Sequence, residues 1–131
     1  MAHILLIDDD DDVRTMLRLT LVHFGHTVIE ARNGREGLAL FPHAAADLVI
    51  TDIVMPEGEG LEVLMALRHH QPPVKIMAIS GGGRVSAADY LHMAKAMGAA
   101  KVLAKPFSAE VLMTAVNELL AAGGASPSRE E

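Results

Sequence analysis

The chain has 131 residues, half of them apolar, and a formal net charge of −6 at pH 7. The length and composition predict one globular α/β domain, and the charge and the scarcity of aromatic residues argue against a nucleic-acid-binding surface. The absence of cysteine excludes disulfides, thiolate metal sites and cysteine nucleophiles, and it fits a reducing, cytoplasmic compartment. The apolar run at residues 3–7 is too short for a signal peptide or a membrane span.

Five short apolar runs along the chain predict the strands of a sheet. Apolar residues at consecutive positions are typical of parallel strands, which are buried on both faces. The runs cover residues 3–7, 27–30, 48–52, 74–79 and 102–104.

Segments with helical periodicity separate these runs. In the first, we expect Asp11 or Asp12 to cap the helix and Gly25 to end it. The second is expected at residues 34–41, with Pro42 just past its end. The apolar positions of the first helix are Val13, Met16, Leu17, Thr20, Leu21 and Phe24.

The later helices follow the same pattern. Leu61, Leu64, Ala66 and Leu67 mark the third, and a capping box begun by Ser86 starts the fourth, which reaches Gly98. Ser108 is expected to cap the fifth. The predicted inward face of that helix is Val111, Leu112, Ala115, Val116, Leu119 and Leu120.

The strict alternation of strand and helix predicts one domain with a parallel sheet, helices on both faces and right-handed crossovers. We place this domain at residues 1–122. Residues 123–131 are polar and rich in turn formers, and are expected to be a disordered tail.

Each informative polar side chain stands where a predicted strand ends. Asp8 and Asp9 follow the first strand, Asp52 the third, Ser80 the fourth and Lys105 the fifth. Because parallel strands end at one edge of the sheet, these groups are expected to converge. A lone aspartate after a strand is more often a turn or cap residue, so the interpretation depends on the whole set.

Such a cluster would need positive charge, because neighbouring carboxylates repel one another when ionised. Lys105 supplies one charge, and oxygen ligands alone favour a hard divalent cation such as Mg²⁺. Carboxylates, a hydroxyl, an ammonium group and Mg²⁺ suit phosphoryl transfer, in which one carboxylate can be the nucleophile. The alternative of a calcium loop starting at Asp8 is disfavoured, because Val13 and Leu19 replace its required glycine and glutamate.

The motifs together resemble the receiver domains of bacterial two-component response regulators, over about residues 2–122. They are the acidic pair within Leu6-Ile7-Asp8-Asp9-Asp10, the Asp52–Pro56 segment with Gly60 after it, Ser80, and Lys105-Pro106-Phe107. The resemblance implies a flavodoxin-like (βα)5 three-layer sandwich with strand order 2-1-3-4-5 and the site at the switch point.

The resemblance also assigns roles to individual residues. Asp52 matches the phosphoacceptor, which is also a Mg²⁺ ligand, and Asp9 matches the other carboxylate that binds Mg²⁺ directly. Asp8 matches the carboxylate that acts through water, and the backbone carbonyl ligand falls at Val54. Ser80 then matches the hydroxyl that turns toward the phosphoryl group.

Lys105 matches the lysine that pairs with the acceptor and then with phosphoryl oxygen, and the Lys105–Pro106 bond is expected to be cis. The chain departs from the family pattern in two places, at Val102 and after Ser80, where three glycines replace a mixed loop. Val102 stands where the family usually has an aromatic ring that swings inward. Neither Val54 nor Gly82 offers a polar side chain to position an attacking water, which predicts a long-lived phosphoryl state.

The function implied is a stand-alone phosphoacceptor that is not itself an enzyme. A sensor histidine kinase or a histidine phosphotransfer protein would phosphorylate Asp52. The switched surface, formed by the fourth helix, fifth strand and fifth helix, would then bind an unidentified output protein. The protein would act as a monomer or as a phosphorylation-dependent dimer, without nucleic acid or membrane.

Alternatives remain open at this point. The chain could be a receiver fragment of a longer regulator or hybrid kinase, or a receiver-like module that works without phosphorylation. A hydrolase with Asp52 as nucleophile is disfavoured because Val54 stands where a second aspartate would act as acid and base. A flavodoxin-like anion-binding module is disfavoured because five aspartates follow the first strand.

Overall fold

The computed structural model describes residues 1–53, 59–70, 72–80, 92, 94–96 and 98–124. Val54, Gly82, most of the predicted fourth helix and the last seven residues of the predicted tail lie outside this part. The predicted sheet is confirmed, with all neighbouring strands parallel and the order β2-β1-β3-β4-β5. Its strands are β1 (His3–Ile7), β2 (Thr27–Ala31), β3 (Leu48–Asp52), β4 (Lys75–Ser80) and β5 (Lys101–Ala104).

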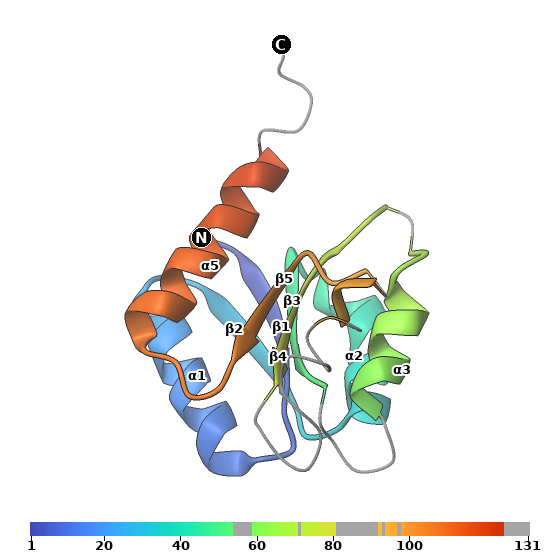
Figure 1. Cartoon of the computed structure of the whole chain (residues 1–131), viewed down its shortest axis with the longest axis horizontal. Helices are drawn as coiled ribbons and strands as arrows, with labels where there is room; N and C mark the ends of the chain where they lie inside the picture. Colours follow the sequence, from blue (N-terminus) through green and yellow to red (C-terminus); the bar gives the residue numbers. More distant parts are fainter. Residues whose placement is uncertain (54–58, 71, 81–91, 93, 97, 125–131) are drawn as a thin grey trace.

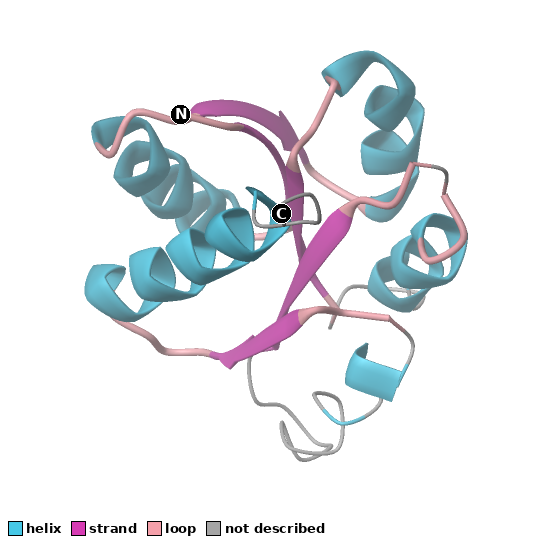
Figure 2. Cartoon of the chain, turned by 90° about the horizontal axis from the view of Figure 1, so that it is seen from above, coloured by secondary structure: helices cyan, strands magenta, loops and turns pink. Residues whose placement is uncertain are grey.

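Helices cover both faces of the sheet, which makes the three-layer sandwich visible in Figures 1 and 2. One face carries α1 (Asp11–His23) and α5 (Ala109–Gly124), and the other carries α2 (Gly34–Ala44) and α3 (Glu59–Leu67). In the described part of the chain, no helix combines the length and apolarity that crossing a bilayer requires.

Alternating side chains of the central strands build two cores. In β1, Ile4 and Leu6 pack with the α1 and α5 side, whereas Leu5 and Ile7 pack with the α2 and α3 side. All four are at most 1% exposed, as expected for a strand buried on both faces. The central strands are therefore rigid supports for the residues at their carboxyl ends.

The cap of α1 differs from the prediction. Asp10, not Asp11 or Asp12, has the extended backbone of an N-cap, and its carboxylate accepts hydrogen bonds from the amides of Asp12 and Val13. The helix therefore starts one or two residues earlier than predicted. Two predicted core positions of this helix, Met16 and Phe24, are exposed.

Two further helices differ in detail. Helix α2 continues past Pro42 to Ala44 and ends at Ala45 in the left-handed conformation, although Pro42 has no N–H to donate to the Leu38 carbonyl. In α5, Ser108 does cap the helix by accepting from the Val111 amide. Val111 itself is exposed, and Met113 is buried in its place.

Helix α3 approaches the end of β3 very closely at Gly60. A Cβ atom at this position would lie 2.4 Å from the backbone oxygen of Asp52 and 2.4 Å from Cα of Ile53. These are backbone atoms, so they cannot rotate away. Gly60 therefore allows the helix to pack directly behind the strand end that carries Asp52.

We expect Gly60→Ala to lower the free energy of unfolding by about 1–3 kcal/mol, the usual cost of forcing extra volume into a packed site. Gly37→Ala in α2 is the matched control, because its Cβ would meet side-chain atoms of Ile7 instead of backbone atoms. Its cost should be smaller, because a side chain can shift more easily than the backbone of a central strand. Urea unfolding of both variants measures the difference. Equal losses would contradict this account of Gly60.

Candidate functional site

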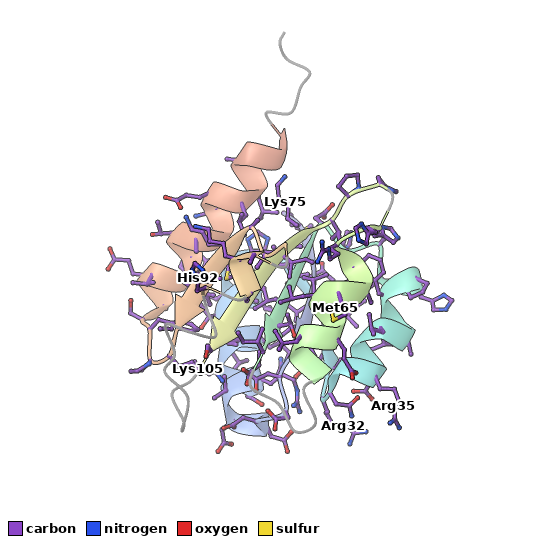
Figure 3. All side chains as sticks on the ribbon, turned by 45° about the vertical axis from the view of Figure 1, so that its right-hand side comes forward. Arg32, Arg35, Met65, Lys75, His92 and Lys105 are labelled. Carbon is purple, nitrogen blue, oxygen red and sulfur yellow. The ribbon has the colours of Figure 1, made fainter. Side chains whose placement is uncertain are left out.

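The carboxyl ends of the strands meet at one end of the molecule. Figure 3 places Lys75, at the start of β4, and Lys105, just after β5, at opposite ends. Asp8 directly follows β1, and Asp52 and Ser80 are the last residues of β3 and β4. Backbone hydrogen bonds join these ends, from the Ile53 amide to the Ile79 carbonyl and from the Lys105 amide to the Ser80 carbonyl.

Three of the predicted site residues form an acidic cluster. Carboxylate oxygens of Asp8, Asp9 and Asp52 all lie within 4.8 Å of one another. Asp8 and Asp52 are buried, at 1% and 4% exposure, whereas Asp9 is exposed. Two carboxylates of the cluster are therefore buried, and the cluster is open to solvent on the Asp9 side.

Lys105 bridges the two buried carboxylates. Its Nζ lies 3.2 Å from Asp8 Oδ2 and 3.3 Å from Asp52 Oδ2, and it donates a hydrogen bond to each. Burial alone would lower the pKa of this ammonium group, but the attraction of Asp52 and Asp8 raises it above its usual value. The peptide bond that follows, Lys105–Pro106, is cis as predicted.

Ser80 brings a hydroxyl group to the same end of the sheet. The side chain is fully buried, and its Oγ has no hydrogen-bond partner among the described residues. Its strand neighbour is Ala104, the residue before Lys105. Val102 is half-buried and packs against the core on the α2 and α3 side.

Asp8 is held from four directions. Its amide donates to the Ala31 carbonyl, and its own carbonyl accepts from Arg14 Nη1 at 2.8 Å. Its carboxylate accepts from the Asp10 amide through Oδ1 and from Lys105 through Oδ2. Arg14 was not among the predicted site residues, although its position three residues after Asp11 permits their ion pair within α1.

The donor set suits a hard divalent cation. Asp8, Asp9 and Asp52 offer only oxygen, and Mg²⁺ favours carboxylate oxygen and water. The exposed Asp9 leaves the cluster accessible to metal and water. The remaining aspartates of the acidic run have other surroundings, since Asp10 caps α1 and Asp11 pairs with Arg14 at 2.6 Å.

The chain is similar to single-domain and multidomain regulators. It is 34% identical to the response regulator receiver protein CpdR of Brucella abortus, over 93% of this chain and 99% of CpdR. It is also 34% identical to the chemotaxis protein CheY of Bacillus subtilis, over 92% and 99%. The match to the transcriptional regulatory protein GlrR of Escherichia coli is 31% and covers 91% of this chain but only 26% of GlrR.

Several curated relatives are therefore much longer than this chain, which spans 12% of the sensor kinase CckA of Brucella abortus. Among solved structures, a response regulator receiver domain protein from Clostridium thermocellum gives a TM-score of 0.85 at 29% identity, over 95% of this chain and 98% of that one. The family model described as "Response regulator receiver domain" matches residues 4–117. This chain thus belongs to the response regulator receiver domain family.

Proposed function

We propose that Asp52 is the phosphoacceptor of this receiver domain and that the acidic cluster is its Mg²⁺ site. The observation that carries the proposal is the bridge from Lys105 to Asp8 and Asp52 at 3.2 and 3.3 Å. It puts a cation between two buried carboxylates beside a third, exposed one. This is the charge arrangement that transfer of a phosphoryl group to a carboxylate requires.

In the proposed step, a carboxylate oxygen of Asp52 attacks the phosphorus of a phosphohistidine. The new O–P bond forms as the P–N bond breaks, and the electron pair of that bond leaves with the imidazole of the donor. Asp9, Asp52 and the Val54 carbonyl would hold Mg²⁺ directly, and Asp8 would hold it through water. When bound, Mg²⁺ supplies positive charge to the phosphoryl oxygens.

Lys105 and Ser80 would then respond to the product. Lys105 is already within hydrogen-bond distance of Asp52 and would form an ion pair with a phosphoryl oxygen after transfer. Ser80 has a buried hydroxyl without a partner among the described residues, so a phosphoryl oxygen would give it an acceptor. Their movement would shift the equilibrium of the surface that includes β5 and α5.

In this proposal a sensor histidine kinase or a histidine phosphotransfer protein donates the phosphoryl group in the cytoplasm. The output is contact with another protein, made by a monomer or by a dimer that forms on phosphorylation. The domain assists its own phosphorylation and dephosphorylation but converts no separate substrate.

A first test is the mass of the intact protein after incubation with acetyl phosphate and Mg²⁺. We expect the wild type to gain one phosphoryl group, because Asp52 supplies the nucleophile and the metal neutralises charge. Asp52→Asn, which keeps the shape of the side chain, should gain none, and chelation of Mg²⁺ should abolish the gain in the wild type. An equal gain in Asp52→Asn would exclude Asp52 as the acceptor.

A second test concerns the lifetime of the phosphorylated state. Val54 has no polar group to position an attacking water, so Val54→Asn should speed hydrolysis of the aspartyl phosphate severalfold. The rate of phosphate release from the purified phosphoprotein measures this, with Val54→Leu as an apolar control. An unchanged rate in Val54→Asn would count against the predicted long lifetime.

A third test uses the raised pKa of Lys105. A raised folded-state pKa means that the lysine stabilises the fold below its ordinary value of 10.5, and that this contribution is lost as the pH rises through the folded-state value. The stability advantage of the wild type over Lys105→Met should therefore hold at neutral pH and shrink above about 10.5. Urea unfolding of both proteins across this range measures it. An advantage independent of pH would indicate packing instead of charge.

A further inference from the structure

A buried arginine lies directly behind the acidic cluster. Arg14, in the first turns of α1, is 9% exposed. Its guanidinium donates to the Asp8 carbonyl at 2.8 Å, to the Asp11 carboxylate at 2.6 Å and to Glu30 at 3.1 Å. Burial would lower the pKa of this group, but the hydrogen bonds to Asp11 and Glu30 raise it, so Arg14 stays charged.

The bond to the Asp8 carbonyl fixes the peptide that precedes Asp9. A peptide unit is planar, so the Asp8 carbonyl and the Asp9 amide turn together. The peptide after Asp9 is held as well, because the Asp10 amide donates to Asp8 Oδ1 at 2.9 Å. The Asp9 carboxylate makes no hydrogen bond or ion pair with another described residue. Its direction therefore depends on these two peptide planes, and Arg14 holds one of them.

Glu30 anchors the arginine to the sheet. It lies on β2 opposite Leu6 of β1, and it accepts from Arg14 Nε through Oε1. Its other oxygen forms an ion pair with Arg18 Nε at 2.9 Å. Arg18 shares this anchor one helical turn later, but among the described residues it makes no hydrogen bond or ion pair with residues 8–11. Arg18 is therefore a natural control for Arg14.

We propose that Arg14 is a positioning residue that aims the Asp9 carboxylate into the metal site and thereby sets its affinity for Mg²⁺. The inference rests on the proposed function, because it takes Asp9 as a direct metal ligand. Outer partners that orient metal ligands commonly change metal affinity by roughly 10–100-fold. Arg14 acts on Asp9 through the backbone of Asp8. Its additional bonds to Glu30 on the sheet and to Asp11 on the helix hold its guanidinium in place.

The test is a Mg²⁺ titration followed by the amide NMR spectrum, which reports metal binding and folding in one sample. We expect Arg14→Lys and Arg14→Met each to raise the Mg²⁺ dissociation constant by roughly tenfold. Lysine keeps the charge but cannot reproduce the fork of a guanidinium, so it should not rescue the site. Arg18→Lys should bind Mg²⁺ like the wild type.

The alternative is that Arg14 acts only through its charge, and it predicts a different pattern. Arg14→Lys would then match the wild type, and Arg14→Met would bind Mg²⁺ more tightly because a repelling cation is gone. That pattern, or a loss of affinity in Arg18→Lys as large as in Arg14→Lys, would overturn the inference.

Glu30→Gln covers the case in which both Arg14 variants unfold. It keeps an oxygen for Arg14 Nε but removes the anchoring charge, so it should raise the dissociation constant by a smaller factor. An unchanged constant in this variant would overturn the inference. A wild type that binds no Mg²⁺ would instead overturn the proposed metal site, and the two failures are therefore distinguishable.

Discussion

The arrangement of this domain depends on placing two carboxylates in its interior. Asp8 and Asp52 are at most 4% exposed, and buried charges of like sign are costly unless an opposite charge lies beside them. Lys105 meets this need from another strand, at 3.2 and 3.3 Å. The ion pairs bring together Asp8 just after β1, Asp52 at the end of β3 and Lys105 just after β5. Any group that adds negative charge at Asp52 must therefore compete with Asp8 for the same lysine.

The parallel sheet explains why these residues can meet at all. Parallel pairing puts the ends of β1, β3 and β4 at one edge, and the register sets their depth, with Asp52 beside Ile79 and Ser80 beside Ala104. The backbone of Gly60 admits α3 directly behind Asp52. The site thus consists of short side chains on rigid strand ends, and its precision comes from the core underneath.

The sequence was sufficient for those features that depend on local patterns. Apolar runs located the five strands, and the polar residues that follow them placed Asp52 and Lys105 at one edge. The predicted α1 cap and the predicted end of α2 were wrong by a few residues, because neighbouring aspartates compete for one cap and local sequence fixes helix boundaries poorly. Arg14 was missed because its contact with Glu30 spans sixteen residues and exists only in the folded sheet.

The aspartates at residues 8–11 differ in whether their side chains have a protein partner. Asp8 forms hydrogen bonds with Lys105 and Arg14, Asp10 accepts hydrogen bonds from amides of α1, and Asp11 forms an ion pair with Arg14. Asp9, Asp10 and Asp11 are all exposed, but of these four aspartates only Asp9 has no hydrogen bond or ion pair in the described structure. A ligand that must release its metal is best left without a competing protein partner, provided that its backbone is fixed. Rigid neighbours around an uncommitted carboxylate meet both conditions, which supports the proposed role of Asp9 as a metal ligand.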